Sequence, residues 1–425
     1  MTGTEPNGFY NDFDREELEP RDPDFRSVFQ RGRDRLIHNA AFRRLQAKTQ
    51  VFLSGEYDFY RTRLTHSIEV SQIAGSIARW LNASSGQLRP GFAIDTALVE
   101  ACALAHDIGH PPFGHAGEAT LHRLMKPWGG FEGNAQTLRL ITEIIFTSGR
   151  SRRGMNPSRA FMDGVLKYKT LFCEWDDPHR HFLYDDQQQY LEFVFAGRAF
   201  PADLAPGKAR NGFRSLECQI MDWADDTAYS LNDLVDSANA GFLHLAAVER
   251  WAAGQDLDAH ERTLVDELKA AVTDHRLERM MNRKIGAFVE ACRLVERDTF
   301  MNDLSNRYRF AIAIDPAVVR EQKLYARLAR EVVFQSPQVC QLEHKGGFML
   351  ERIFTALKDN YLEPGSPRQA LLSRDVEVEM QAAGDAPDRR ARIICDYMAG
   401  MTDGFASRIY KRLFDPDYGS IVDLV

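Results

Sequence analysis

The chain has 425 residues, enough for about two or three domains of ordinary size or one large helical domain. Hydrophobic residues make up 44% of it and charged residues 27%, which excludes collagen-like, disulfide-dense and disordered proteins. The 53 basic and 61 acidic residues give a net charge of −8. This balance argues against a protein that coats nucleic acid, but it allows a local basic pocket that binds phosphates.

The ends and the cysteines indicate a cytoplasmic protein. No apolar run approaches the roughly 18 residues of a membrane span, and the N-terminal segment is acidic where a signal peptide would be basic and apolar. The six cysteines are scattered without a C-x-x-C pair, as expected for reduced thiols. Residues 1–25 are polar and rich in Pro and Asp, which predicts a loosely held arm before a single helical body over 26–425.

Three segments have the apolar spacing of helices: Ile68–Leu81, Ile94–Ala105 and Leu216–Val235. The second should end near Gly109, because glycine can close a helix and Pro111 cannot continue it. The third carries, beside its apolar stripe, a second stripe of Asp222, Asp225, Tyr229, Asp233 and Asp236. Such a stripe is either a solvated face or the lining of a site.

The rest of the chain gives no alternating strand pattern and no hairpin signal, so the sequence predicts an all-α protein. Polar breaks occur at 149–157, 176–189, 201–212, 363–367 and 383–387, and none has the character of a domain linker. The break at 176–189 contains His179 and His181 among Asp and Gln residues, and we interpret it as an exposed connection and not as a ligand cluster.

Histidine is concentrated in one part of the chain. Five of the twelve lie between positions 66 and 122, and three of these fall in the run A-H-D-I-G-H-P-P-F-G-H-A-G-E. A single histidine is usually a packing or surface residue, but this density beside carboxylates favours a metal site. His106 and Asp107 point about 100° apart on a straight helix, so both can bind one ion only near the helix end. Imidazole and carboxylate together suit Mn, Fe, Co, Ni, Zn or Mg.

His115 and Glu118 are three residues apart, which places them on one face at the start of a helix. A carboxylate that holds an imidazole sets its tautomer and raises its basicity, as an acid/base pair requires. The alternative is an ordinary surface pair at a helix start.

Longer strings narrow the assignment. In order along the chain they resemble the deoxyguanosine triphosphate triphosphohydrolase-like family of HD-domain metal-dependent phosphohydrolases, over about residues 26–410. The strings are RLIHNAAFRRLQAKTQVF (35–52), RTRLTHSIEV (61–70), HDIGHPPFGHAGE (106–118), FEGNAQ (131–136), LKY (166–168), ADDTAYSLNDLVD (224–236) and DYMAGMTDGFA (396–406).

The resemblance implies an all-α HD-domain fold with its metal core at about 61–236, similar to the catalytic domain of the mammalian SAM-and-HD-domain dNTP hydrolase. It also implies cleavage of a dNTP to a deoxynucleoside and inorganic triphosphate, with water attacking the α-phosphorus. One divalent ion (Mn, Mg, Co, Fe or Ni) would be held by His66, His106, Asp107 and Asp225. The family spacing of Asp, Tyr and Asp selects Asp225 over Asp226, because Tyr229 and Asp233 then follow in register.

The same resemblance implies roles for further residues. His115 with Glu118 would be the acid/base pair. Arg63 and His110 would contact the α-phosphate, and Lys167 the β- or γ-phosphate. Residues near the sugar and base would be Gln50, Val51, Tyr229 and Asp233. Tyr229 would stack near the sugar and exclude a 2′-hydroxyl, and Asp233 would read the 3′-hydroxyl, although a half-buried Tyr229 in the core is the alternative.

Arg307 and Arg309 would meet phosphates at the active site or at an effector site between subunits, or else are surface residues. The chain departs from the family after L-K-Y, where Lys169 stands in place of the usual Pro and puts the role of Lys167 in question. The family also implies a homo-oligomer, a tetramer or hexamer, with a dNTP or single-stranded nucleic acid as a candidate effector.

Two other functions compete with dNTP hydrolysis. One is another HD phosphohydrolase, acting on a nucleoside monophosphate, a cyclic dinucleotide or an alarmone. The other is a nucleotide or nucleic-acid sensor with vestigial catalysis. The other HD phosphohydrolases lack the H-P-P-F-G-H-A-G-E continuation and the Tyr-x-x-x-Asp pair, both of which this chain has. The intact His115 and Glu118 argue against a sensor with vestigial catalysis.

Overall fold

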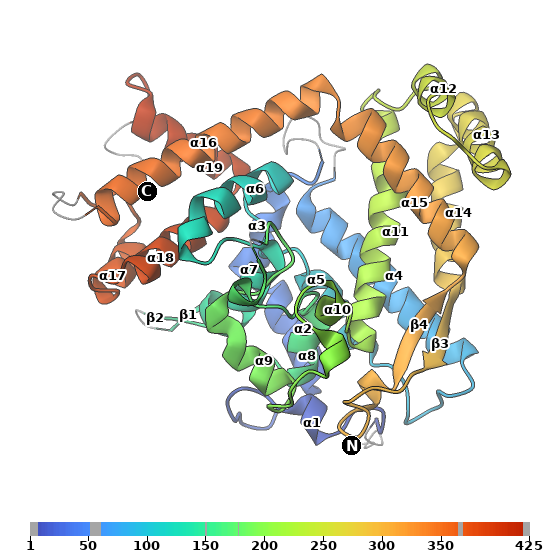
Figure 1. The fold of residues 1–425 in the computed structure, drawn as a ribbon, viewed down its shortest axis with the longest axis horizontal. Coiled ribbons are helices and arrows are strands. Elements are labelled where there is room, and N and C mark those ends of the chain that lie inside the picture. The colour runs from blue at the N-terminus through green and yellow to red at the C-terminus, as the bar shows by residue number, and fades with distance from the viewer. Residues whose placement is uncertain (1–6, 52–60, 149–150, 177, 364–368, 420–425) are drawn as a thin grey trace.

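Three helices form the centre of the protein, in a computed structural model that describes residues 7–51, 61–148, 151–176, 178–363 and 369–419. They are α4 (Arg63–Ser84), α5 (Thr96–Ala105) and α11 (Leu216–Asn239), and each packs against the other two (Figure 1). All three segments predicted from apolar spacing are therefore confirmed as helices. The apolar residues of α4 that gave the prediction, from Val70 to Leu81, lie in the core.

Local signals fix where these helices begin. The Thr62 side chain accepts a hydrogen bond from Thr65 N at the start of α4, and the Asp95 side chain accepts one from Leu98 N at the start of α5. Such N-caps each contribute about 1 kcal/mol. Helix α5 ends at Ala105, so His106 and Asp107 come directly after its last turn, as the string around Gly109 predicts.

The remaining helices surround this centre. Those of the N-terminal half are α1 (Asp12–Arg15), α2 (Val28–Ile37), α3 (Ala40–Arg44), α6 (Gly114–Met125), α7 (Gly133–Arg139), α8 (Arg159–Val165), α9 (Gln188–Val194) and α10 (Lys208–Asn211). Those that follow are α12 (Leu245–Ala253), α13 (Ala259–Thr273), α14 (Leu277–Glu290), α15 (Pro316–Ala329), α16 (Pro337–Tyr361), α17 (Arg374–Ala382), α18 (Pro387–Ala399) and α19 (Asp403–Phe414). Helix α16 crosses the top of Figure 1 and packs along α6.

Two short antiparallel strand pairs correct the expectation of no strands. One joins β1 (Phe146–Ser148) to β2 (Ser151–Arg153), and the other joins β3 (Cys292–Glu296) to β4 (Phe310–Ile314) with Cys292 opposite Ile314. Both pairs lie at the periphery, so the fold remains the all-α architecture that the sequence predicts (Figure 1).

The N-terminal arm is not loosely held over the part that the structure describes. Phe9 and Tyr10 are 0% and 1% exposed, and the Tyr10 hydroxyl donates a hydrogen bond of 2.8 Å to Glu217 Oε1 on α11. The expectation for residues 1–25 is therefore wrong at these positions. Burial of these two large aromatic rings is favourable enough to hold the segment against the protein, although most of its residues are polar.

Arg307 lies in the protein interior, so neither the expected phosphate contact nor the alternative of a surface arginine fits its position. Its side chain is fully buried, with Nε 2.8 Å from Glu217 Oε2 and Nη2 3.0 Å from Asp163 Oδ2. These carboxylates hold the pKa of Arg307 well above its usual value despite its burial. A buried cation needs such partners, and removing one of them is strongly destabilising. Arg309 is exposed and donates to Asn306 Oδ1 at 3.4 Å.

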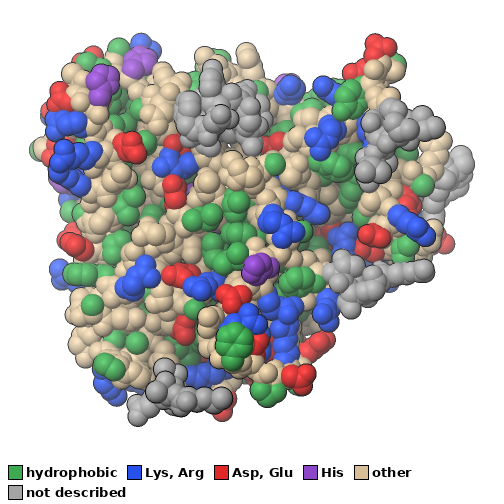
Figure 2. Space-filling view, turned by 180° about the vertical axis from the view of Figure 1, so that it is seen from behind, with side chains coloured by type: hydrophobic (Ala, Val, Ile, Leu, Met, Phe, Trp, Pro, Cys, Tyr) green, Lys and Arg blue, Asp and Glu red, His purple; other side chains and the backbone are tan. Residues whose placement is uncertain are grey.

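Charged side chains of both signs are interspersed on the face shown in Figure 2. Among the helices of the described ranges, none is both long and apolar enough to cross a membrane.

Candidate active site

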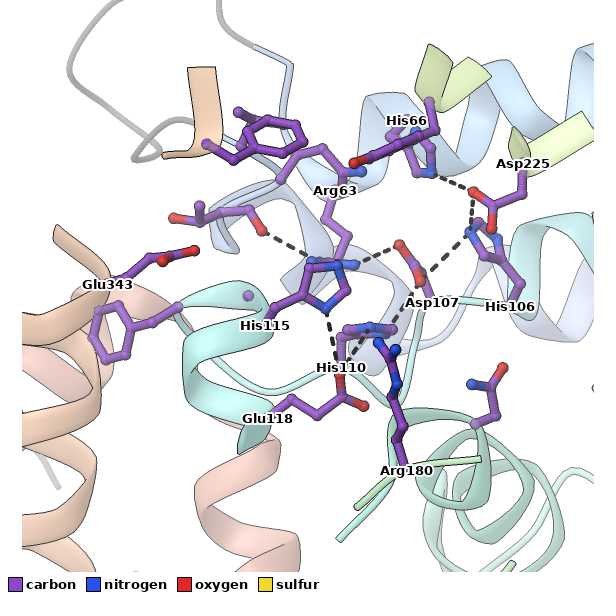
Figure 3. Close-up of a pocket in the computed structure, with 18 of the residues that line it drawn as sticks. Arg63, His66, His106, Asp107, His110, His115, Glu118, Arg180, Asp225 and Glu343 are labelled. Atoms are coloured by element: carbon purple, nitrogen blue, oxygen red, sulfur yellow. Dashed lines mark hydrogen bonds and ion pairs between the residues drawn. The ribbon is translucent and has the colours of Figure 1, made fainter. Parts of the chain in front are cut away.

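A cavity of about 560 Å³ brings most of the predicted site residues together (Figure 3). Its walls come from α4, the segment after α5, α6, α11 and the helices near Arg330 and Glu343. Among the residues that line it are Gln50, Val51, Arg63, His66, His106, Asp107, His110, His115, Glu118, Lys167, Asp225 and Tyr229.

Asp233 does not line the cavity. It lies one turn beyond Tyr229 on α11 and is 2% exposed, and its Oδ2 has no hydrogen-bond partner. Burial, together with the negative charge of Asp236, raises its pKa well above the usual value. The predicted contact with the 3′-hydroxyl of a sugar is therefore not supported by this geometry.

The four predicted metal ligands meet at one point. Asp225 Oδ1 lies 3.2 Å from His66 Nε2 and 3.6 Å from His106 Nε2, and Asp107 Oδ1 lies 3.5 Å from His106 Nε2. Ligand atoms of His66, His106 and Asp107 all lie within 4.8 Å of one another. The neighbouring carboxylate of Asp226 is exposed, so α11 presents Asp225 and not Asp226 to the two histidines.

His106 is prepared to accept a cation. Its Nδ1–H donates to the Ala103 carbonyl at 2.6 Å, which leaves the lone pair of Nε2 directed into the site. This buried Nε2 has no hydrogen-bond partner. Burial alone would lower the pKa of His106, but Asp107 and Asp225 outweigh it and raise the pKa to about 9. The site therefore favours positive charge at this nitrogen, and its donor set fits a divalent metal ion.

Arg63 holds the Asp107 carboxylate. Its Nη1 donates to Asp107 Oδ2 at 2.6 Å, and its Nε donates to the Thr49 carbonyl at 3.3 Å. Burial alone would raise the pKa of Asp107, but His106, Arg63 and His110 hold it well below its usual value. Asp107 is thus an ionised carboxylate with one oxygen turned toward the histidines and the other fixed by Arg63.

His115, Glu118 and His110 form a second group beside the first. His115 Nδ1 lies 3.4 Å from Glu118 Oε2, and the side chain of His115 is 80% exposed. Burial alone would raise the pKa of Glu118, but the hydrogen bond from His115 and the charge of His110 lower it to about 2. Glu118 is therefore ionised at neutral pH and can fix the tautomer of a histidine that faces the cavity.

The backbone places this second group precisely. Phe113 has φ of 63° in the left-handed region, directly before α6. Gly133 N, at the start of α7, donates to Glu118 Oε1 at 2.8 Å. The loop before α6 packs so closely on α7 that a Cβ at Gly109 would lie 2.2 Å from the Gly133 carbonyl oxygen. Only glycine fits this position of the His-Asp string.

Lys167 and Arg180 add positive charge to the cavity. Lys167 Nζ lies 2.6 Å from Asp222 Oδ1 and 3.5 Å from Asp225 Oδ2. Arg180 lines the cavity and is exposed, and Figure 3 shows its guanidinium directed toward the part of the cavity that holds His110 and Glu118.

The interpretation of 176–189 as an exposed connection is wrong from His181 to Tyr184, whereas Arg180 is exposed as expected. Phe182, Leu183 and Tyr184 are no more than 2% exposed. The His181 ring stacks on Tyr168 of the L-K-Y string with centroids 4.3 Å apart. Sequence reasoning missed this wall of the site, because no local pattern indicates that the segment returns to L-K-Y.

Lys169, which departs from the family pattern, is fully buried beneath this wall. Its Nζ donates to the Leu166 carbonyl at 2.5 Å and lies 3.6 Å from Asp163 Oδ1. The loop at L-K-Y is thus held from the inside, and Lys167 still reaches the cavity.

The opposite end of the cavity is more apolar. Tyr229 is half-buried, with its ring 5.9 Å from that of Phe334. Val51 and Phe334 pack against a small cluster formed by Val333 and Val339. Arg330 and Glu343 also line this end, and neither they nor Phe334 was singled out from the sequence.

Two family models match the chain: the HD domain over residues 63–152 and the phosphohydrolase-associated domain over residues 312–412. With the helical fold and the cluster around His106 and Asp107, they define the class as an HD-domain phosphohydrolase.

Sequence relatives narrow the class. Deoxyguanosinetriphosphate triphosphohydrolase-like proteins of Shewanella sp. (strain ANA-3) and Shewanella woodyi are 34% and 35% identical to the chain, covering 94% of it and 95% of each relative. The corresponding protein of Aliivibrio salmonicida is 33% identical over 92% of the chain and 94% of its own length. The chain belongs to the deoxyguanosinetriphosphate triphosphohydrolase-like family. A solved phosphohydrolase from Bacteroides thetaiotaomicron is similar at 13% identity and a TM-score of 0.43, over 95% of this chain and 74% of that one.

Proposed function

We propose that the protein hydrolyses a deoxynucleoside triphosphate to a deoxynucleoside and inorganic triphosphate, with a divalent metal ion as cofactor. The observation that carries the proposal is that the His66, His106, Asp107 and Asp225 group lies in the same cavity as His115 and Glu118. An ion site beside an ionised carboxylate–histidine pair supplies charge stabilisation and proton transfer, two functions that promote hydrolysis of a phosphate ester.

The metal ion would be held by His66, His106, Asp107 and Asp225. When bound, it would stabilise the negative charge that develops on the α-phosphate oxygens. Arg63 keeps Asp107 ionised and oriented through its contact of 2.6 Å. Nε2 of His106 supports this assignment, because it is buried and forms no hydrogen bond, yet lies 3.5 Å and 3.6 Å from carboxylate oxygens of Asp107 and Asp225, as neighbouring ligands of one ion would.

Proton transfer is assigned to His115, with Glu118 as the carboxylate that orients it. His115 is exposed to the cavity, whereas Glu118 is fixed by His115 and by Gly133 N. The proton would pass between His115 and either the attacking water or the 5′-oxygen that leaves. His110 lies between the proposed metal ligands and the acid/base pair, with Nδ1 3.1 Å from Asp107 Oδ1 and Nε2 3.9 Å from Glu118 Oε2. The α-phosphate would bind at this place.

A triphosphate brings about four negative charges near neutral pH, and the cavity offers cations to receive them. Arg63 would serve the α-phosphate as a cation and His110 as a hydrogen-bonding group, since burial lowers the pKa of His110 below its usual value, and Lys167 and Arg180 would serve the outer phosphates. Lys167 would release one of its two carboxylates to do so. Arg180 needs no such exchange, since it is exposed at the cavity wall.

The deoxyribose and base would occupy the end lined by Gln50, Val51, Tyr229 and Phe334. A tyrosine packed over the 2′ carbon leaves no room for a hydroxyl and would select deoxyribose. Asp233 would act only through its neighbour on α11, because it lies outside the lining. A homo-oligomer, and a dNTP or single-stranded nucleic acid as effector, belong to this proposal as the family implies them.

The test is product analysis by anion exchange, with protein loaded with Mn and given each dNTP alone and then all four together. Deoxynucleoside and intact triphosphate from any one dNTP support the proposal and name the base. Activity only in the mixture adds an effector site. If none of the tubes yields triphosphate, the proposal fails, and the other HD phosphohydrolase or sensor functions take its place.

A further inference from the structure

No residue of 396–406 lines the cavity, but the carboxylate of Asp403 in this segment forms hydrogen bonds with two segments that do. Asp403 is the first residue of α19 and is 5% exposed. Its Oδ1 accepts a hydrogen bond from Phe113 N at 2.9 Å. Its Oδ2 accepts one from Thr49 N at 2.8 Å and another from the Thr49 hydroxyl. One side chain therefore joins two segments of the cavity wall that are far apart in sequence.

Both segments position groups that the proposed reaction uses. Phe113 has a left-handed backbone conformation and directly precedes α6. A hydrogen bond to its N–H therefore fixes the start of the helix that carries His115 and Glu118. Thr49 directly precedes Gln50, and its carbonyl accepts from Arg63 Nε at 3.3 Å. A shift of Asp403 would alter the distance between the acid/base pair and the opposite wall of the cavity.

Lys48 makes a second tie at the same place. It is 2% exposed, and its Nζ donates to the His110 carbonyl at 2.5 Å and to the Ala399 carbonyl at 2.8 Å. Ala399 ends α18, four residues before Asp403. The connection between α18 and α19 is therefore anchored to the His-Asp string through a buried ammonium as well as through a buried carboxylate.

We propose that Asp403 is a positioning residue for the reaction, acting through Phe113 and Thr49 on His115 and on the substrate wall. The inference rests on the proposed function and deepens it, because it gives the C-terminal 312–412 region a part in catalysis. Asp403 contacts neither the predicted metal ligands nor the cavity. Its effect is on geometry, and a misplacement of about 1 Å at such a site costs about 10²-fold in rate.

The experiment compares Asp403→Ala, Asp403→Asn and the control Asp388→Asn, which changes an exposed aspartate in the first turn of α18. Each full-length variant is loaded with Mn, and kcat, KM, bound metal and melting temperature are measured. Hydrogen exchange is followed by mass spectrometry in peptides covering residues 48–51 and 110–118. Exchange needs no activity, so it tests the proposal even if wild type released no triphosphate and the proposed function failed.

We expect Asp403→Ala to keep bound metal, to lose about 10- to 100-fold in kcat and to exchange faster in both peptides. Asp403→Asn keeps one acceptor oxygen, so its loss in kcat should be smaller than that of Asp403→Ala. If the alanine variant does not fold, the asparagine variant provides the test. Asp388→Asn should stay within about twofold of wild type. The proposal is overturned if exchange in both peptides is unchanged. It is also overturned if kcat stays within about twofold of wild type while only the melting temperature falls.

Discussion

Asp225 Oδ1 lies 3.2 Å from Nε2 of His66, although 159 residues separate the two in sequence. The contact joins the first turns of α4 to the middle of α11. Burial alone would raise the pKa of Asp225, but His106, His66 and Lys167 hold it well below its usual value. The two ends of the predicted ligand set are thus brought together by the central helices.

The first prediction concerns metal binding. Asp225→Asn should lower bound Mn from about one ion per chain to near zero and abolish hydrolysis, because a neutral amide replaces an anionic ligand. Asp226→Asn, on the same helix, is the matched control and should keep its metal. Elemental analysis after dialysis measures both. Equal metal content in the two variants would refute the ligand assignment.

The second prediction separates binding from turnover. His115→Ala should keep bound metal and the affinity for dNTP but lose about 10²- to 10⁴-fold in kcat, as removal of a general acid or base does. Binding is measured by calorimetry with a dNTP analogue in which a methylene group replaces the 5′-oxygen, so that the bond to the α-phosphorus cannot be hydrolysed, and turnover by triphosphate release. The exposed His179 gives a control, since His179→Ala should be silent. Near-normal kcat in His115→Ala would remove the acid/base assignment.

Arg180 gives the third prediction. Arg180→Ala should raise the KM for a dNTP about tenfold with a smaller change in kcat, because a charge-assisted contact to a phosphate contributes about 1.5–3 kcal/mol. Steady-state kinetics at two salt concentrations measure it, and the salt dependence of KM should weaken in the variant. Arg320→Ala, at an exposed position of α15, is the control. An unchanged KM and salt dependence would place Arg180 outside substrate binding.

The fourth prediction concerns pH. Burial and the charges of Arg180 and Lys167 lower the pKa of His181 from 6.5 to about 4. Between these values the unfolded chain binds more protons than the folded protein, so stability rises with pH in this window. The contribution is fully present above about pH 6.5 and is lost as pH falls toward 4.

Urea unfolding of His181→Gln and wild type at pH 7 and pH 4.5 measures this effect. The loss of stability on acidification should be smaller in the variant than in wild type, and His179→Gln should behave like wild type. Equal losses in all three proteins would show that His181 titrates normally.

The helices that carry the proposed metal ligands could be predicted because their signals are local. Apolar spacing gave α4, α5 and α11, and the glycine and prolines after His106 gave the end of α5. The choice of Asp225 over Asp226 came from the resemblance to the family, whose Asp, Tyr and Asp spacing places Tyr229 and Asp233 in register, and the structure presents Asp225 to the histidines.

The features that could not be predicted depend on tertiary contacts. His181 lies against Tyr168 because the Asn211 side chain holds the His181 carbonyl, at 2.8 Å, and the backbone of Lys169. Arg307 is a buried partner of carboxylates from three separate segments, and nothing in S-N-R-Y-R-F distinguishes it from a surface arginine. Strand β4 has the sequence F-A-I-A-I, a short apolar run that periodicity does not distinguish from a buried helix segment.

The most direct test of the proposed reaction is hydrolysis of a dNTP by the Mn-loaded protein in ¹⁸O-labelled water, with both products analysed by mass spectrometry. Attack of water on the α-phosphorus with departure of the 5′-oxygen predicts one ¹⁸O atom in the triphosphate and none in the deoxynucleoside. Label in the deoxynucleoside would place the attack on carbon. A deoxynucleoside monophosphate with pyrophosphate, or a diphosphate with phosphate, would contradict the account altogether.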